Sequence, residues 1–112
     1  MTDSLASWRA AWKSDAEVGP VAQTILFEND KVRVWEIVLD PGEELAVHTH
    51  SIDYVIVTVE GSVMEVRNQQ GESVVQEGRP GDTRWTDVGD GQTHLLKNVG
   101  TTRFSNRVIE IL

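Results

Sequence analysis

The histidines of this sequence have the spacing of a metal site. There are three of them, His48, His50 and His94. His48 and His50 are two residues apart, so in an extended segment their imidazoles project from one face and can converge on one ion. A third ligand must come from a distant strand, and His94 can supply it. Three imidazoles on a rigid scaffold leave coordination positions open, which is typical of a metal site that acts on a ligand.

Glycines flank these histidines in two motifs. The first reads Gly42-EELAV-His48-Thr49-His50-SID-Tyr54-VIVTVE-Gly61, and the second ends in Gly91-QT-His94-LLK-Asn98. They resemble the two motifs of the cupin family, and the resemblance extends over residues 25 to 112. Three positions depart from the family pattern. Tyr54 stands in place of a glutamate in the first motif, and Thr83 and Gly89 stand in place of a glycine and a proline in the second.

The resemblance implies an all-β cupin fold, a double-stranded β-helix or jelly-roll barrel, in which His48, His50 and His94 hold a metal. Imidazole suits iron, manganese, nickel, zinc and copper, so the expected cofactor is a divalent transition metal whose identity the ligands do not select. The alternative is that the histidines form hydrogen bonds inside a polar barrel without metal. The motifs say little about the reaction, because cupins host many unrelated activities.

Tyr54 is the main departure and the candidate catalytic residue. It can coordinate as a phenolate, donate a hydrogen bond to bound substrate or oxygen, or fill the space of the absent glutamate. An unperturbed phenol titrates near about 10, so we expect Tyr54 to be protonated and to face the metal cavity without binding the ion. The adjacent carboxylate, Asp53, is expected to point away as a loop acid, because neighbouring side chains of an extended chain alternate.

The donor set also indicates a class of substrate. Three neutral imidazoles leave the full charge of a divalent ion uncompensated, which favours an anionic or chelating small molecule. A three-histidine shell resembles those of cupin dioxygenases that cleave diketones or oxidise thiols with ferrous iron. We therefore interpret the chain as a metal-dependent, dioxygenase-like enzyme. The alternative is a non-catalytic module that binds a small ligand or a metal, since no clear general base accompanies Tyr54.

The elements that must position these residues follow from hydrophobic periodicity. Leu5, Trp8 and Trp12 share one stripe, which predicts a short helix over residues 4–17 that ends at Gly19-Pro20. From residue 25 onward, strand-like runs alternate with turn residues. We expect about nine strands, among them 31–39, 54–60, 83–88, 93–98 and 103–111, with a hairpin pairing 63–67 with 72–76. Residues 1–20 form an N-terminal helical segment and residues 21–112 form the barrel domain in this interpretation.

Composition sets further bounds. A chain of 112 residues holds a single domain, and without cysteine it has neither disulfides nor thiolate ligands. The net charge of −8 argues against nucleic acid and anionic membranes as partners, because both require a cationic face. Apolar runs are far shorter than a membrane span and no signal peptide is evident, so a cytoplasmic location is expected.

Several other residues have weaker signals. Trp35 and Trp85 are expected to fill the core rather than line a pocket. Asn98 is interpreted as turn chemistry at a strand end. Strand 54–60 is apolar on both faces, with Tyr54 and Ile56 inward, so its outer face needs cover, and we predict a homodimer that buries this face and the Trp8–Trp12 helix. The outward residues of this strand are Val55, Val57 and Val59. An arginine within a strand can pair with an anionic substrate, although most such arginines face water. The candidates are Arg33, Arg84, Arg103 and Arg107.

Overall fold

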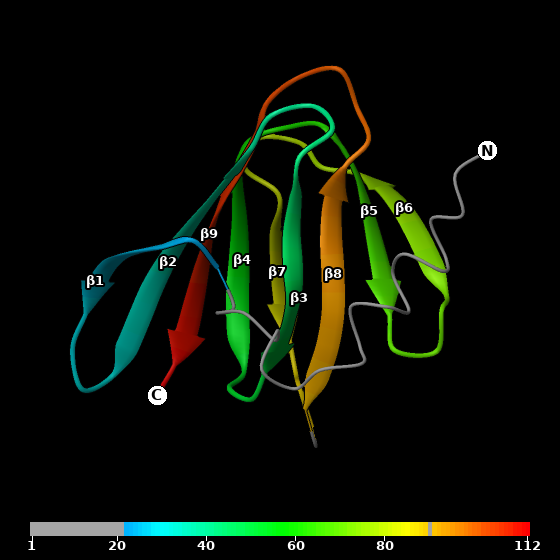
Figure 1. The fold of residues 1–112 in the computed structure, drawn as a ribbon. Coiled ribbons are helices and arrows are strands. Elements are labelled where there is room, and N and C mark those ends of the chain that lie inside the picture. The colour runs from blue at the N-terminus through cyan, green and yellow to red at the C-terminus, as the bar shows by residue number, and fades with distance from the viewer. Residues whose placement is uncertain (1–21, 90) are drawn as a thin grey trace.

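The computed structural model describes residues 22–89 and 91–112, and nine strands form its regular structure (Figure 1). The predicted helix over 4–17, and with it the segment 1–20, lies outside the described residues. No helix in the described part of the chain is long and apolar enough to cross a membrane. The strands are β1 Thr24–Glu28, β2 Val32–Leu39, β3 Glu44–His50, β4 Tyr54–Glu60, β5 Val63–Asn68, β6 Ser73–Glu77, β7 Thr83–Thr86, β8 Gln92–Asn98 and β9 Phe104–Ile111.

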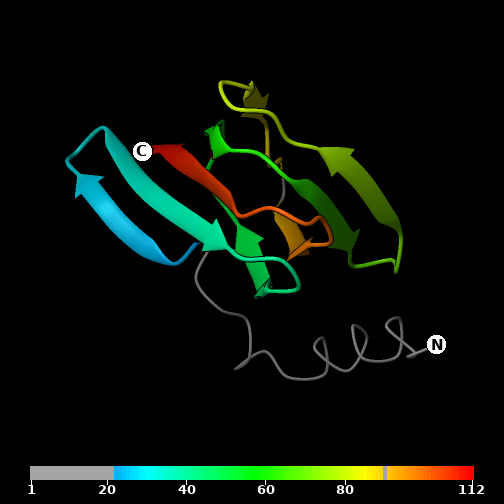
Figure 2. The same ribbon diagram turned by 90° about the horizontal axis from the view of Figure 1, so that it is seen from above.

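The strands form two antiparallel sheets that face each other (Figure 2). One sheet has five strands in the order β1-β2-β9-β4-β7, and the other has four in the order β3-β8-β5-β6. Strands that are neighbours in space are mostly distant in sequence, as in a jelly roll. The predicted all-β barrel of about nine strands is confirmed, and the predicted hairpin is the pairing of β5 with β6.

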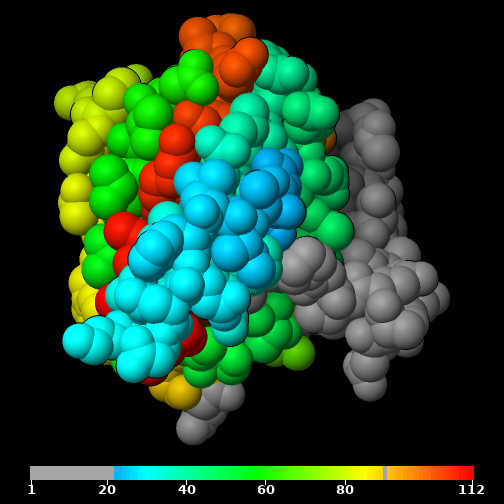
Figure 3. Space-filling view, turned by 90° about the vertical axis from the view of Figure 1, so that its left-hand side faces the viewer, coloured from blue at the N-terminus to red at the C-terminus, as the bar shows by residue number. Residues whose placement is uncertain are grey.

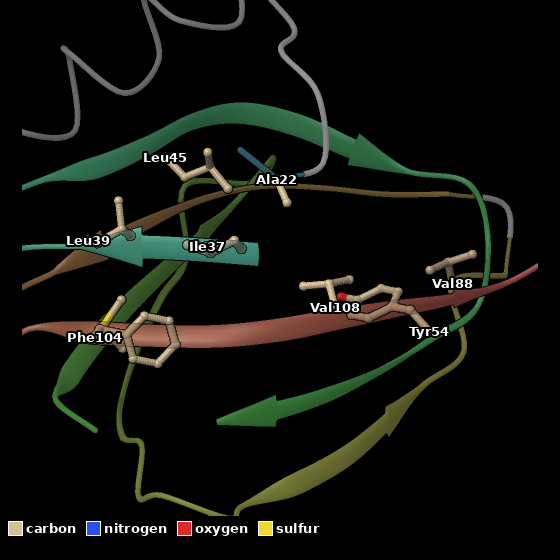
Figure 4. Packing of buried hydrophobic residues seen from close by; sticks show 9 residues of the cluster. Ala22, Ile37, Leu39, Leu45, Tyr54, Val88, Phe104 and Val108 are labelled. Carbon is tan, nitrogen blue, oxygen red and sulfur yellow. The ribbon is translucent and has the colours of Figure 1, made fainter. Parts of the chain in front are cut away.

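Alternation along each strand separates an inner from an outer face. In β9, Phe104 and Val108 point inward and are buried, whereas Ile109 points outward. Figure 4 shows the inward side chains of β2, β3, β4 and β9 meeting in one cluster, which includes Ile37, Leu45 and Tyr54. Burial of such apolar side chains is the main term that holds the sheets together.

The two strand tryptophans have different environments. Trp35 packs against the buried cluster as expected. Trp85 does not, since 51% of it is exposed and its indole nitrogen donates to Asp87 Oδ1 at 2.9 Å. The expectation that Trp85 fills the core was wrong. The reason is register: β7 is an edge strand whose Trp85 lies opposite Val55, an outward residue of β4.

An apolar row crosses the outer face of the five-stranded sheet. Its members are direct partners across successive strands, in the order Phe27, Val34, Ile109, Val55 and Trp85. We call these five residues the outer row. The first and last are more than half exposed. Figure 3 views this side, where β1 and β2 (blue to cyan), β9 (red), β4 (green) and β7 (yellow) follow one another across the surface.

Asn98 lies at the end of the second motif and is completely buried. Its Nδ2 donates to the carbonyls of Leu39 and Thr102 at 2.9 and 2.8 Å. Its Oδ1 accepts from Ser62 Oγ at 2.9 Å and from the amide of Gly100 at 3.0 Å. The residue therefore joins the end of β8 to three other segments, which is a wider role than the local turn chemistry expected from the sequence.

A β-bulge in β3 determines where the histidines point. Leu45 pairs with Leu96 and His48 pairs with His94, so three steps along β3 match two along β8. Regular alternation would place Leu45 and His48 on opposite faces. The extra residue of the bulge restores the same face for both. As a result Leu45 lies in the core cluster while His48 lines the internal cavity.

Candidate metal centre

The structure brings the three histidines together on the inner face of the four-stranded sheet. His48 and His94 are direct partners across β3 and β8. The three ring centroids are separated by 4.5 to 4.9 Å, with the rings nearly perpendicular to one another. One nitrogen from each ring can be chosen so that all three lie within 4.8 Å of one another. This group can hold a metal ion.

The hydrogen bonds of the rings indicate which nitrogens face an ion. His48 Nδ1 donates to the carbonyl of Ala46 at 2.8 Å, so Nε2 carries the free lone pair. His50 Nε2 and His94 Nε2 are 3.1 Å apart, a separation that two ligands of one ion can have when metal–nitrogen bonds are about 2.0–2.1 Å. The Nδ1 atom of His50 is buried and has no hydrogen-bond partner within the described residues. These donors fit a divalent transition metal.

Burial keeps all three imidazoles neutral at physiological pH. Desolvation lowers the pKa of His48 below its usual 6.5, although the Ala46 carbonyl opposes the shift. Desolvation lowers the pKa of His50 to about 3, and repulsion from His48 adds to the effect. The pKa of His94 is also lowered to about 3, by burial and by both neighbouring histidines. Only the neutral ring can bind a metal, so the site is prepared for one across the neutral range.

Tyr54 lies beside the histidines and points inward. Its ring stacks on that of His50 with the centroids 4.3 Å apart and 26° between the planes. The hydroxyl donates to Gln92 Oε1 at 2.6 Å. Burial raises the pKa of the phenol above 10, partly offset by the hydroxyl of Thr86 and the charge of Arg84. A protonated phenol that already donates to an amide is a poor metal ligand, so we still expect Tyr54 to contact the ligands rather than the ion.

Gln92 belongs to this site and was missed in the sequence. It is the partner of His50 across β3 and β8, and it fixes the Tyr54 hydroxyl. A signal was present, because Gln92 precedes His94 by two positions and so shares its face in a strand. Asp53, by contrast, does not join the histidines. Its carboxylate accepts from the amide of Val88 at 2.9 Å, so it holds a loop.

A cavity of about 260 Å³ extends from the histidines between the two sheets. Its walls are mostly apolar, with Ile56, Leu96 and Val108 among them. The exposed lining residues come from the segment 77–84, between the edge strands β6 and β7, so the mouth opens there. The volume is enough for a small organic molecule but below the usual range of drug-sized sites.

The four arginines that were candidates for an anionic substrate differ in their partners. Arg33 pairs with Glu28 and Glu110, Arg103 with Asp40, and Arg107 with Glu36. Arg84 has no carboxylate within 4.0 Å among residues 22–89 and 91–112, and it lines the cavity. Arg84 is therefore the arginine placed to meet an anion that enters the cavity.

A Tyr54→Phe variant is expected to retain its metal. The change removes the hydrogen bond to Gln92 but leaves the stack on His50, so we expect a loss of stability of about 1 kcal/mol and a change in metal affinity of less than about tenfold. Ligand binding or activity should change, because the variant removes a hydroxyl from the cavity wall. Elemental analysis and thermal denaturation measure the first two effects. Metal loss as complete as in a histidine variant would instead identify the phenol as a ligand.

Comparisons with known proteins agree with this fold. A cupin domain from Bordetella pertussis Tohama I is 28% identical, with 84% of this chain and 99% of that one covered and a TM-score of 0.71. A Klebsiella pneumoniae protein with a double-stranded β-helix domain is 22% identical over 87% of this chain and 84% of that one, with a TM-score of 0.61. A cupin superfamily protein from Desulfitobacterium hafniense is 13% identical over 87% and 85%, with a TM-score of 0.59.

No protein-family model matches the sequence, and no curated protein matches it. The structural likeness covers 99% of the Bordetella domain and 84% of this chain, so the two share one complete fold. The chain has the fold of a small cupin, as the two histidine motifs implied, and its three-histidine group could hold a metal.

Proposed function

We propose that this cupin is a metal-dependent enzyme that acts on a small organic anion inside the barrel, with dioxygenase-like chemistry as the leading reaction class. The observation that carries the proposal is the convergence of three neutral imidazoles at the wall of a cavity that is also lined by Arg84, whose guanidinium has no carboxylate partner among the described residues. Neutral ligands do not compensate the charge of a divalent ion, so both the ion and Arg84 favour an anion between them.

Each part of the site has a role in this proposal. His48, His50 and His94 would hold the ion, and a divalent metal there would supply Lewis-acid or redox chemistry toward a substrate oxygen. Tyr54 and Gln92 fix the orientation of His50 through the stack and the 2.6 Å hydrogen bond. Arg84 orients the anionic group near the mouth, and the apolar walls exclude water from the rest of the substrate.

Oxygen consumption tests the reaction class. Protein purified without a histidine tag is loaded anaerobically with ferrous iron and given a β-diketone or a thiol-bearing carboxylic acid. We expect oxygen uptake that depends on iron and on substrate, with both atoms of labelled dioxygen in the product. Absence of uptake by the iron-loaded protein with both kinds of substrate would remove the dioxygenase assignment.

Replacement of Arg84 by Gln tests the anionic substrate. A partly exposed ion pair contributes up to about 1 kcal/mol, so we expect about fivefold weaker binding of a carboxylate such as butyrate to the zinc-loaded protein. Arg103→Gln is the matched control, because Arg103 is exposed, paired with Asp40 and absent from the cavity wall. Titration calorimetry at low salt measures both variants. Equal affinities in the two variants would exclude Arg84 from anion recognition.

A second function, a non-catalytic binding module, is favoured by one observation. The site offers no free general base among the described residues around Tyr54. The phenol is hydrogen bonded with a raised pKa, and the buried carboxylate opposite it, Glu110, accepts from Trp35 Nε1 at 2.7 Å and from Arg33 at 3.4 Å. Tight binding of a carboxylate to the metal-loaded protein without any turnover would support this module.

We also propose that the chain forms a homodimer through the outer row. A two-fold axis would lay the outer row of one copy on that of the other, and the adjacent Glu36–Arg107 ion pair gives this face both signs of charge. Light scattering at micromolar concentration should give twice the 12.5 kDa chain mass, and Trp85→Glu should return the protein to a monomer. A monomeric wild-type protein would overturn this assembly.

A further inference from the structure

One polar side chain inside the cavity has no use in the site described so far. Asn106 lies on β9, lines the cavity and is only 3% exposed. Its Oδ1 atom is buried and accepts no hydrogen bond from the described residues. Buried polar atoms nearly always have a partner, since an unpaired one loses its hydration without compensation. A bound molecule that donates to this oxygen would account for it.

The residue opposite strengthens this interpretation. Thr58 of β4 is the direct partner of Asn106, is 7% exposed and also lines the cavity. Only backbone hydrogen bonds are formed by Thr58 within the described part of the chain, so its hydroxyl has no partner there. The apolar side chains of Ile37, Met64 and Phe104 are part of the same wall. Two adjacent polar groups without partners among the described residues therefore face the same end of the cavity.

The position of this pair relative to the histidines is set by the strands. Inward residues of β4 are Tyr54, Ile56 and Thr58 in succession, and each step of two residues advances about 6.7 Å along the strand. Tyr54 stacks on His50 and marks the metal end. Ile56 lies in the layer in between, where its partners are Val108 on one side and Arg84 on the other. The cavity thus has a polar end at the histidines, a middle layer that is apolar except for Arg84, and a second polar end at Asn106.

We propose that Asn106 and Thr58 form a second recognition point, which selects small anions that have a hydroxyl or N–H donor at the end remote from the metal. The inference rests on the proposed function for the anionic end of the ligand. The substrate class it defines is an elongated organic acid with an apolar middle: the carboxylate lies toward the metal and Arg84, and the remote donor binds Asn106 Oδ1. Thr58 would accept from or donate to the same ligand group.

Matched pairs of small acids test the proposal. The zinc-loaded protein is titrated with linear carboxylic acids of four, five and six carbons, each with and without a terminal hydroxyl, and binding is followed by calorimetry. Zinc avoids turnover, so the readout is affinity alone. We expect the hydroxy acid to bind about fivefold more tightly than the plain acid at the chain length that spans the cavity, the effect of one neutral hydrogen bond.

Asn106→Leu replaces the amide by an apolar group of similar volume, so it should fold at least as well as the wild type and keep its zinc. We expect the preference for the hydroxy acid to vanish or to reverse, while the plain acid binds as before or more tightly. Thr58→Val, a change of similar shape, should reduce the same preference. If Asn106→Leu or Thr58→Val fails to fold, the other variant still tests the proposal.

Three other outcomes overturn the proposal, and the last of them also overturns the proposed anionic substrate. If the wild type binds both members of every pair equally, or if the preference survives in Asn106→Leu and Thr58→Val, the second recognition point is wrong and the anion site stands. If no acid of either kind binds to the zinc-loaded protein, the inference fails together with the proposed anionic substrate.

Discussion

A His94→Ala variant is expected to lose its metal, whereas the wild type should bind one divalent transition metal per chain. His94 supplies one of three nitrogens that lie within 4.8 Å of one another, and two imidazoles alone form a weak site. The affinity should fall by more than the about 10–100-fold that follows loss of a group supporting a ligand. Elemental analysis of protein purified without a histidine tag, followed by zinc titration, measures the effect.

The neighbouring threonine provides a matched control for this prediction. Thr93 lies next to His94 in β8, but its hydroxyl is 2.9 Å from that of Thr49 on the opposite face of the sheet. Thr93→Ala changes the same strand without touching the histidines, so it should keep full metal. Stoichiometric metal in His94→Ala would contradict the three-histidine assignment, and metal loss in both variants would indicate damage to β8 instead.

The sequence contained enough to predict the fold and the histidine group. The spacing of His48 and His50 placed both rings on one face, and the second motif placed His94 on a partner strand; the register His48 opposite His94 agrees with both. This worked because alternation and turn residues are local properties of the chain. The pairing of strands distant in sequence came from the cupin resemblance and not from the local pattern.

The remaining parts of the site depend on tertiary contacts that no local pattern encodes. The bulge in β3 sets the facing of His48, and it appears only in the pairing of β3 with β8. Among the four candidate arginines, Arg84 differs because the others have carboxylate partners. Asn106 is distinguished by the absence of a partner for its Oδ1 atom in the described structure. Each of these facts concerns pairs of residues far apart in sequence.

The free energy of unfolding of the metal-free protein should fall steeply as the pH is lowered. The pKa values of His50 and His94 are about 3 in the folded protein and 6.5 when the rings are exposed. Between these values the unfolded chain binds protons that the folded chain does not, so the free energy of unfolding falls as pH falls. The stabilisation is present above pH 6.5 and is lost progressively below it.

The magnitude follows from the number of protons. Each histidine contributes up to about 1.4 kcal/mol per pH unit, so the pair contributes up to about 3 kcal/mol per unit in the middle of this range. Small domains have a total stability of only about 5–15 kcal/mol. We therefore expect the chelator-treated protein to lose several kcal/mol between pH 6.5 and pH 5, where most carboxylates are still ionised.

Urea denaturation of the metal-free protein at pH 7.0, 6.0 and 5.0 measures this loss, and a His50→Gln/His94→Gln double variant is the control. The glutamines keep polar groups at both positions but cannot take up a proton, so the double variant should lose much less stability over the same interval. Equal slopes in the two proteins would show that the histidines are not held neutral by burial. A steep slope in the wild type alone would mean that the fold itself keeps the rings deprotonated, which is the state a metal requires.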